Sequence, residues 1–561
     1  MASSSSSTSR STPLWLHCAV PAACLATTYL LYGSKTKLLT WVYDRVAKSG
    51  RNPLPGKAYL TGNFAPVDDE LFSEDLPVVE GKLPPGLDGC YVRAGPNPFF
   101  KPVAGYHWFD GDGMLHAVRI RNGRVSYCNR YVDTERLRQE RAAGRPLFPR
   151  LGDLVGQRGL TLMLLNRIAQ ALGVVRIQHG SGTANTALVY HSGRLLALNE
   201  GDLPYGVRVG CSGLIETLGR LRFSKAWSKS FTAHPKIDPV NGELLFIGYR
   251  FDANPYVSAG VMDEYGNLVR HWGVELPYPV MMHDLAVTEH YVVLLHLPLC
   301  FDPQAMVKDR TVPFKLRTDL PSRIGLLRRE QPSCPAGGAE VTWLELPGPG
   351  AMAFHVATAW EDAAGDVKVF ACQMDELNMD LDAADFAKEA AHLTEYTLSP
   401  SAGTASLRRL SQVAGDFPVV HPGKATRSAK WAWMATLEPS GSVPSFTGIA
   451  KLDLTPNKPG KDACVSRITY PPGCFGGEAV FVPRASTLAD PRAAKRCSED
   501  DGWLMVYVYD TNADVSYMNL YDARTMSAKP VTSVRMPRRV PYGFHGTWVS
   551  EYQMKAQVMW V

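Results

Sequence analysis

The amino-acid sequence predicts an all-β protein, and the prediction rests on repeated hairpin signals along the chain. In each signal, a turn that contains glycine leads into a run of β-branched, aromatic or other apolar residues, which is the pattern of a β-hairpin. The signals recur from the first quarter of the chain to near its end. They lie at residues 122–127, 192–198, 241–247, 265–269, 365–370 and 501–507.

Many hairpins in one long chain favour a β-propeller among the all-β folds. The chain has 561 residues, of which 45% are hydrophobic and 20% are charged, so it can bury one large core or several smaller ones. Length alone would predict roughly three or four domains. The hairpins are spaced too irregularly for a strict repeat, so periodicity does not supply a number of blades.

Two segments interrupt the β pattern. Residues 133–174 begin with a charged stretch and end with an apolar run from Gly159 to Gly173, which predicts a helix closed by glycine. Two roles suit this helix: it packs against the body of the protein, or it forms a cap that dips into a membrane and opens a substrate tunnel. Residues 373–400 are acidic and rich in alanine, which predicts a helical insertion at the surface.

The N-terminal segment, residues 1–50, differs from the rest in composition. Residues 1–43 contain no Asp or Glu, and a Ser, Thr and Arg tract is followed by an apolar run that ends at Tyr32. This composition favours a plastid transit peptide, although the run is also long enough for a membrane anchor or a secretory signal. Residues 34–48 then predict a helix that either lies at a membrane interface or packs on the body. Its apolar positions are Leu38, Trp41, Val42 and Val46.

Four histidines in apolar or small-residue surroundings are the main candidates for chemistry. They are separated by 49, 72 and 190 residues, which fits no local metal-binding loop. Only a closed fold that returns the chain repeatedly to one axis brings them together, and the inner strands of a propeller do this. Such an all-nitrogen shell suits iron or another divalent transition metal. The four are His234, His283, His355 and His545.

A structural role competes with metal binding for each of these histidines. The chain has 14 histidines, and a histidine beside Phe or Met is more often a hydrogen-bonded core residue than a ligand. His290 and His296 lie in equally apolar surroundings. Local sequence therefore indicates a metal site without deciding which histidines belong to it.

Charge and cysteine content exclude other classes of function. The net charge of +5 is small for a chain of this length and gives no case for nucleic-acid binding, which normally needs a concentrated basic face. The 11 cysteines include no Cys-x-x-Cys pair, so a zinc ribbon is not indicated. An odd, scattered set of cysteines is compatible with a reducing compartment.

Eight motifs, in order from about residue 60 to the C-terminus, resemble those of the plant carotenoid cleavage dioxygenases. Within that family the chain is most similar to the branches of the zaxinone synthases and the 9-cis-epoxycarotenoid dioxygenases. Eight ordered motifs are far more specific than any one of them. The motifs are residues 62–67, 91–98, 109–114, 198–205, 233–239, 282–284, 475–478 and 540–546.

The resemblance implies a fold and a set of site residues. It implies a seven-bladed β-propeller over residues 51–561, with a helical cap around residues 133–174 at the mouth of a tunnel. His234, His283, His355 and His545 would bind Fe(II) in this reading. Glu200, Asp416 and Glu478 would be the carboxylates that orient the imidazoles. The phenylalanines implied for the tunnel are Phe100, Phe354, Phe417 and Phe544.

The resemblance also implies a reaction. An Fe(II) dioxygenase of this kind cleaves one C=C bond of a carotenoid or apocarotenoid with O2 and gives two carbonyl products. Its expected location is the plastid, where it would bind peripherally to a membrane. Two other functions stay open at this point: a related propeller that isomerises its polyene, and a polyene-binding protein without cleavage.

Overall fold

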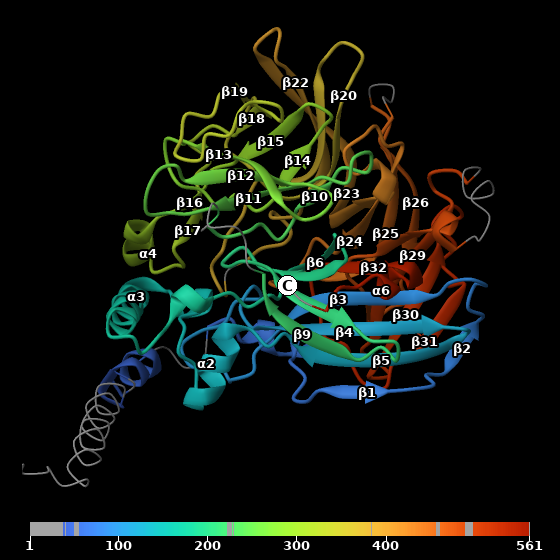
Figure 1. Ribbon diagram of the computed structural model, residues 1–561, viewed down its shortest axis with the longest axis horizontal. Coiled ribbons are helices and arrows are strands. Elements are labelled where there is room, and N and C mark those ends of the chain that lie inside the picture. The colour runs from blue at the N-terminus through green and yellow to red at the C-terminus, as the bar shows by residue number, and fades with distance from the viewer. Residues whose placement is uncertain are drawn as a thin grey trace, which may run out of the picture.

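The computed structural model describes residues 37–39, 41–49, 55–221, 227, 229–382, 384–455, 460–487 and 497–559. Nearly all of its regular structure is β-strand, arranged in antiparallel sheets (Figure 1). The predicted all-β class is therefore confirmed. The predicted targeting segment spans residues 1–50, and its residues 1–36 lie outside the described residues.

Most sheets are built from strands that follow one another in the chain. Three four-stranded sheets have the orders β6-β7-β8-β9, β10-β11-β12-β13 and β14-β15-β18-β19. A two-stranded sheet, β16-β17, lies within the third of these segments of the chain. The strands are β6 (Ala187–His191), β7 (Arg194–Leu198), β8 (Tyr205–Val209), β9 (Ile215–Arg220), β10 (Lys236–Ile237), β11 (Leu244–Tyr249), β12 (Val257–Met262), β13 (Leu268–Val274), β14 (Leu285–Val287), β15 (Tyr291–His296), β16 (Leu299–Phe301), β17 (Phe314–Leu316), β18 (Arg323–Arg328) and β19 (Val341–Glu345).

A seven-stranded sheet runs from β20 to β26, and its long central strand, β23, pairs with a different neighbour along each part of its length. The first part of β23 pairs with β22, with His392 opposite Ala414, and the last part pairs with β24, with Gly415 opposite Thr436. The strand thus passes from one group of strands to the next. The members are β20 (Met352–Glu361), β21 (Val367–Met374), β22 (His392–Ser399), β23 (Thr404–Val420), β24 (Trp431–Leu437), β25 (Phe446–Asp453) and β26 (Cys464–Thr469).

Two further sheets join the N-terminal and C-terminal parts of the described chain. In one, β3 pairs with β32, with Cys90 opposite Val549; in the other, β2 pairs with β31. The orders are β1-β5-β4-β3-β32 and β2-β31-β30-β29-β27, with β28 also on β29. The strands are β1 (Leu71–Ser73), β2 (Val78–Gly81), β3 (Gly89–Asn97), β4 (Asp112–Arg121), β5 (Arg124–Tyr131), β27 (Cys474–Phe475), β28 (Val480–Pro483), β29 (Gly502–Asp510), β30 (Val515–Asp522), β31 (Thr532–Arg535) and β32 (Gly546–Ser550).

Turn chemistry explains why the hairpin signals were reliable. Asn122 and Gly123 both have positive φ, at 50° and 74°, and so do Ser192 and Gly193, at 50° and 72°. Two successive residues of positive φ form the tight turn whose twist matches that of the flanking strands. Apolar side chains then fill the space between sheets, for example Val118 of β4 in one cluster with Met505 of β29.

Helices are few among the described residues, and α2, α3 and α4 lie at one side of the molecule, whereas α6 lies beside β3 and β32 (Figure 1). The helix predicted between Gly159 and Gly173 is α3, which ends just before Gly173, whose φ is 69°. The labelled α-helices of the described residues are α2 (Glu135–Ala143), α3 (Gly156–Ala171), α4 (Pro303–Asp309) and α6 (Glu551–Lys555). Residues 37–39 and 41–48 are also helical and are called the N-terminal helix. Short 3-10 turns occur at Lys57–Leu60, Gly62–Phe64, Leu151–Asp153, Ile177–His179, Pro422–Lys424 and Arg484–Thr487.

The helical insertion predicted for residues 373–400 is wrong. The described part of this segment is a loop followed by β22, which pairs with both β21 and β23. Side chains in the loop take the place of helical hydrogen bonds: the carboxylate of Glu389 accepts from the backbone N–H groups of Asn378 and Asp385. Local polar contacts of this kind compete with helix formation.

Candidate metal centre

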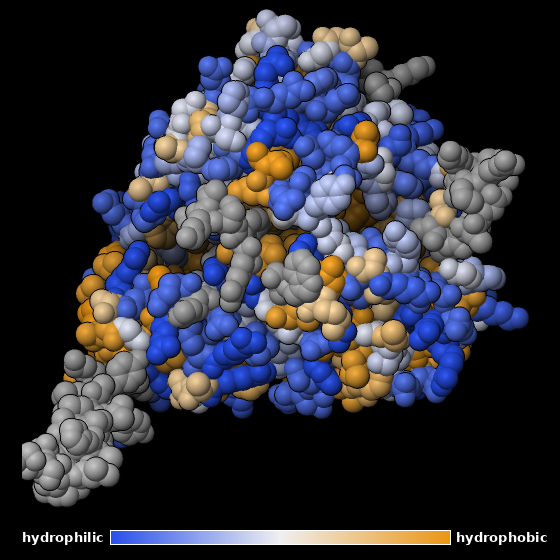
Figure 2. Space-filling view, in the orientation of Figure 1, coloured by the Kyte–Doolittle hydropathy of each residue, from blue (hydrophilic) through white to orange (hydrophobic). Residues whose placement is uncertain are grey.

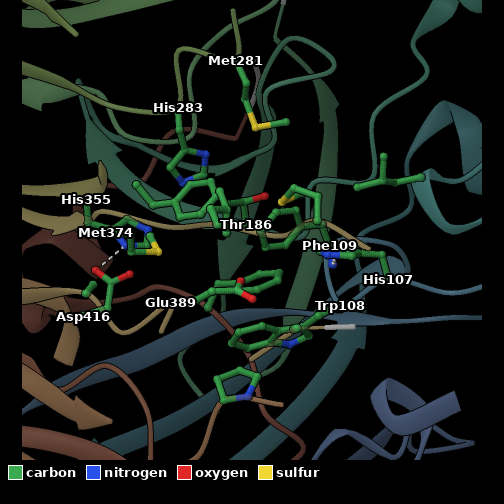
Figure 3. A pocket seen from close by; sticks show the side chains of 18 of the residues that line it. His107, Trp108, Phe109, Thr186, Met281, His283, His355, Met374, Glu389 and Asp416 are labelled. Atoms are coloured by element: carbon green, nitrogen blue, oxygen red, sulfur yellow. Dashed lines mark hydrogen bonds and ion pairs between the residues drawn. The ribbon is translucent and has the colours of Figure 1, made fainter. Parts of the chain in front are cut away.

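The four histidines singled out by the sequence meet in the structure. His234, His283, His355 and His545 have ring centroids 4.5 to 5.2 Å apart for five of their six pairs. The Nε2 atoms of His234 and His283 lie 3.0 Å apart, and those of His355 and His545 lie 3.1 Å apart. Two of these imidazoles, His283 and His355, appear at the wall of the central cavity in Figure 3.

Edge strands of four different sheets deliver these imidazoles. His234 lies two residues before β10, His283 two residues before β14, and His545 directly before β32. His355 lies inside β20, where the register against β21 shifts between Ala353 and Val356. A register shift of this kind re-aims a side chain that regular pairing would direct elsewhere.

The three carboxylates named in the sequence analysis lie behind three of the histidines. Glu200 pairs with Nδ1 of His283, and Asp416 and Glu478 lie 2.9 and 2.8 Å from Nδ1 of His355 and His545. An Nδ1–H that donates to a carboxylate fixes the tautomer and leaves the lone pair on Nε2. Asp416 reaches His355 with a side chain one methylene shorter than those of Glu200 and Glu478.

The carboxylates have partners of their own. The Tyr249 hydroxyl donates to Oε2 of Glu200, and the backbone N–H of Gly546 donates to Oε2 of Glu478 at 2.7 Å. Sequence reasoning missed Tyr249, which ends β11 and has no local signal that separates it from an ordinary strand tyrosine. Burial, together with Glu200, holds the pKa of Tyr249 well above its usual range, so the hydroxyl remains a donor.

Burial and neighbouring charges shift the pKa values of three of the imidazoles. It holds the pKa of His234 well below 6.5, with a further contribution from the other histidines, and it also lowers the pKa of His355 in spite of Asp416. For His283 burial acts in the same direction, but Glu200 outweighs it and the pKa of His283 is raised. Two of the imidazoles are thus held neutral near pH 7, the form that binds metals.

An apolar cavity of about 420 Å³ opens beside the histidines. Of the four phenylalanines that the resemblance implied, Phe354, Phe417 and Phe544 line this cavity and Phe100 does not. Phe100 lies beyond the end of β3, with its ring 5.0 Å from that of Phe99. Trp108 and Phe109 line the cavity instead (Figure 3). The motif 109–114 was recognised in the sequence, but its place in the cavity was not.

Phe417 closes the cavity against two of the imidazoles. Its ring lies 5.0 Å from the ring of His355 and 5.1 Å from that of His545. The residue has a φ of 55°, in the left-handed region that bulky side chains rarely adopt, and the register of β23 against β24 shifts beside it. Strain of this kind persists where surrounding structure imposes it. A large aromatic residue therefore limits the space next to the histidines.

The alternative histidines lie elsewhere. His290 is exposed and pairs with Glu361, with 2.8 Å between Nδ1 and Oε2. His296 is buried, and its Nδ1 lies 3.1 Å from the Arg323 guanidinium. The fold therefore separates His290 and His296 from the cluster of four histidines, which local sequence could not do.

The donor set fits a transition metal. The ligand atoms of His234, His283 and His355 all lie within 4.8 Å of one another, and Nε2 of His545 is 3.1 Å from Nε2 of His355. Imidazole nitrogens suit iron, copper, nickel and zinc, whereas calcium and magnesium require oxygen ligands. Because Nδ1 of His355 and of His545 donates to a carboxylate, their Nε2 lone pairs face each other at 3.1 Å, which is unfavourable unless a cation binds there. This geometry indicates a metal centre.

Comparisons with known proteins agree with this geometry. The sequence profile of the RPE65 family, described as retinal pigment epithelial membrane protein, matches residues 64–550. A carotenoid 9,10(9',10')-cleavage dioxygenase from Phaseolus vulgaris is 40% identical over 510 residues, which cover 89% of this chain and 90% of that protein. The 9-cis-epoxycarotenoid dioxygenase NCED6 of Arabidopsis thaliana, whose name marks it as chloroplastic, is 34% identical, covering 93% and 88%.

Solved structures share the architecture. The lignostilbene dioxygenase of Pseudomonas brassicacearum superposes with a TM-score of 0.72 at 26% identity, covering 89% of this chain and all of that one. From the profile match and the identity to full-length relatives, the chain belongs to the RPE65 family of carotenoid oxygenases.

Proposed function

We propose that this protein is a dioxygenase that cleaves a C=C double bond of a carotenoid or apocarotenoid with O2 and releases two carbonyl products. One observation carries the proposal: four imidazoles converge, and the three that are backed by carboxylates, His283, His355 and His545, line an apolar cavity. A polyene fits such a cavity because it is long, rigid and apolar. The family relatives named above act on carotenoids.

We infer that the metal is Fe(II), held by His234, His283, His355 and His545. When bound, ferrous iron supplies a site at which O2 reacts without a cosubstrate. The residues of the chain bind the metal and orient its ligands. Glu200, Asp416 and Glu478 hold the protons of His283, His355 and His545 at Nδ1, which keeps these three Nε2 atoms available and sets the ring orientations.

The aromatic wall positions the substrate and excludes water. Phe354 lies 5.2 Å from the ring of His283, and Phe109 lies 5.9 Å from Phe354 and 6.0 Å from Phe544. These rings form one continuous surface from the histidines into the cavity. A polyene lying on this surface has one double bond beside the metal, and holding it there converts a bimolecular encounter into an oriented reaction.

The chain folds, in our proposal, as one seven-bladed propeller over residues 51–561. Counting β23 in both groups of strands that it joins, the sheets other than β16-β17 number seven. The histidines come from edge strands of four of them, as inner strands around an axis would provide, and the β3–β32 and β2–β31 pairings close the ring. The helices α2 and α3 then form the cap at the tunnel mouth.

We also propose that the protein docks on a membrane of the plastid through α3 and the N-terminal helix. Tyr43 and Ala47 are buried in a cluster with Leu162, while Leu38 and Trp41 remain exposed. Apolar residues gather over α3 at the same side (Figure 2). The α3 helix has no acidic residue and contains Arg158 and Arg167, which favours binding to an anionic membrane surface. Among the described residues, no helix combines the length and apolar character needed to cross a bilayer.

The test of the reaction uses purified protein loaded anaerobically with Fe(II). It is incubated under labelled ¹⁸O2 with a panel of intact carotenoids and shortened apocarotenoids, and the products are identified by mass. We expect two carbonyl fragments that carry the label from at least one substrate. A protein that holds one iron per chain and yields only intact or isomerised polyene would contradict the proposal.

A further inference from the structure

His234 differs from the other three histidines of the metal centre. Glu200, Asp416 and Glu478 each hold Nδ1 of one imidazole, but among the described residues no carboxylate is paired with His234. Its segment is held through neighbouring residues instead. The backbone N–H of His234 donates to Oγ1 of Thr232 at 3.0 Å, and that hydroxyl lies 3.3 Å from the carbonyl oxygen of His283.

A buried ion pair strengthens the same connection. Lys236, two residues after His234, places Nζ 2.8 Å from Oδ1 of Asp284, the residue directly after His283. The side chain of Asp284 is 1% exposed and that of Lys236 is 17% exposed. The pair therefore holds the beginnings of β10 and β14 together inside the protein.

The carboxylate of Asp284 also reaches a third segment. Its Oδ2 accepts a hydrogen bond from the backbone N–H of Val356 at 2.8 Å, directly after His355 in β20. Its Oδ1 accepts from the backbone N–H of Leu285 at 2.7 Å, which fixes the rotamer of Asp284 itself. One carboxylate thus contacts segments that carry three of the four imidazoles.

We propose that Lys236 and Asp284 are positioning residues of the metal centre, which set the relative places of His234, His283 and His355. This inference rests on the proposed metal site, and it assigns a role to residues that touch neither the metal nor the substrate. Loss of groups that orient metal ligands typically lowers metal affinity by about 10- to 100-fold. A charge left unpaired by removal of either partner also destabilises the fold.

A second buried ion pair, elsewhere in the protein, serves as a control that separates loss of metal affinity from loss of stability. Lys451 and Asp500 form another buried ion pair, 2.7 Å long, with side chains 5% and 13% exposed. Lys451 lies on β25, and neither residue lines the cavity. Lys451→Met therefore measures what the loss of a buried lysine costs in stability without a change at the histidines.

The experiment compares Lys236→Met, Lys236→Arg and Lys451→Met in the full-length protein. The readouts are Co(II) affinity by titration, the visible absorption spectrum of the bound Co(II), and the thermal unfolding midpoint. We expect Lys236→Met to bind Co(II) about 10- to 100-fold more weakly with an altered spectrum. Lys236→Arg should restore much of the affinity, and Lys451→Met should lower the midpoint while binding Co(II) as the wild type does.

Asp284→Asn provides a second variant of nearly the same shape. Its amide nitrogen cannot accept a hydrogen bond, so one of the contacts to Val356 or Lys236 is lost, and we expect the same direction of change. Wild-type affinity and spectrum in both Lys236→Met and Asp284→Asn would overturn the inference, as would an equal loss of Co(II) in Lys451→Met. A wild-type protein that binds metal but cleaves no polyene would defeat the proposed reaction and leave this inference standing.

Discussion

The histidine centre and the outer face of α3 differ in how their side chains are held. At the centre, each carboxylate contact spans a long stretch of sequence and is shorter than 3 Å, as for His545 and Glu478 at 2.8 Å. On α3, Leu160 and Leu164 are 47% and 61% exposed. The centre therefore depends on individual atoms, whereas the helix face depends on its total apolar area. Substitutions at the centre should therefore reduce metal binding and cleavage, whereas substitutions on the helix face should reduce liposome binding.

The largest effect is expected from removing an imidazole. His283→Ala should abolish polyene cleavage, because a three-nitrogen shell binds the metal more weakly and admits an additional water. Iron content and product formation measure this. The control is His290→Ala, since His290 is exposed and pairs with Glu361 away from the cavity. Cleavage at the wild-type rate by His283→Ala would remove this residue from the centre.

The next largest effect concerns the helix face. Leu160→Glu/Leu164→Glu should lose binding to anionic liposomes, because each buried leucine contributes about 1.5 to 3 kcal/mol when fully transferred to an apolar phase. Its iron content and its activity on detergent-solubilised substrate should remain. Leu162 and Leu165 are unsuitable for this test because they pack in the cluster with Tyr43.

A control for this variant is Leu214→Glu/Val240→Glu, which changes two exposed apolar residues elsewhere, 42% and 75% exposed. We expect this protein to bind liposomes normally. If the α3 variant loses its iron, the helix face supports the core, and the division between the two regions is wrong.

A smaller effect is expected when a carboxylate behind an imidazole is neutralised. Glu478→Gln keeps an oxygen that can accept from Nδ1 of His545 but removes the charge, so iron affinity or turnover should fall by about 10- to 100-fold. Metal titration and turnover number measure the change. Unaltered values would show that this carboxylate serves only the backbone N–H of Gly546.

The smallest effect is a shift in pH dependence. Glu200 raises the pKa of His283 above 6.5 against the lowering effect of burial, and His283 must lose its proton to bind metal. Affinity of the metal-free protein for Co(II) should therefore fall as the pH drops through this raised pKa. In Glu200→Gln the midpoint should move to lower pH, although affinity at pH 8 is weaker. Titrations from pH 5.5 to 8.5 test this, and an unchanged midpoint would contradict it.

Local sequence was informative where a feature depends on neighbours in the chain. Turn pairs such as Asn122-Gly123 predicted hairpins because their positive φ angles are intrinsic to those residues. The apolar run closed by Gly173 predicted α3 because helix formation and helix termination also depend on neighbouring residues. The segment 373–400 failed because composition indicated a helix, while pairing of β22 with two other strands outweighed that local preference.

The resemblance named the four histidines and three carboxylates, but it did not supply their contacts. Phe100 was placed at the cavity by motif alone, yet it lies beyond the end of β3 beside Phe99. Tyr249 and Asp284 were not assigned roles, because their partners Glu200 and Val356 are far away in the chain. No periodicity or spacing links such residues.

The sequence by itself determined the all-β class, the positions of most hairpins, and the residue types able to bind a metal, since each depends on the chemistry of a few adjacent residues. Only the tertiary structure decided that His234, His283, His355 and His545 share one centre while His290 and His296 do not. It also decided which leucines of α3 face solvent. The physical reason is that these properties arise from strand order and sheet packing, which bring together side chains separated by up to hundreds of residues.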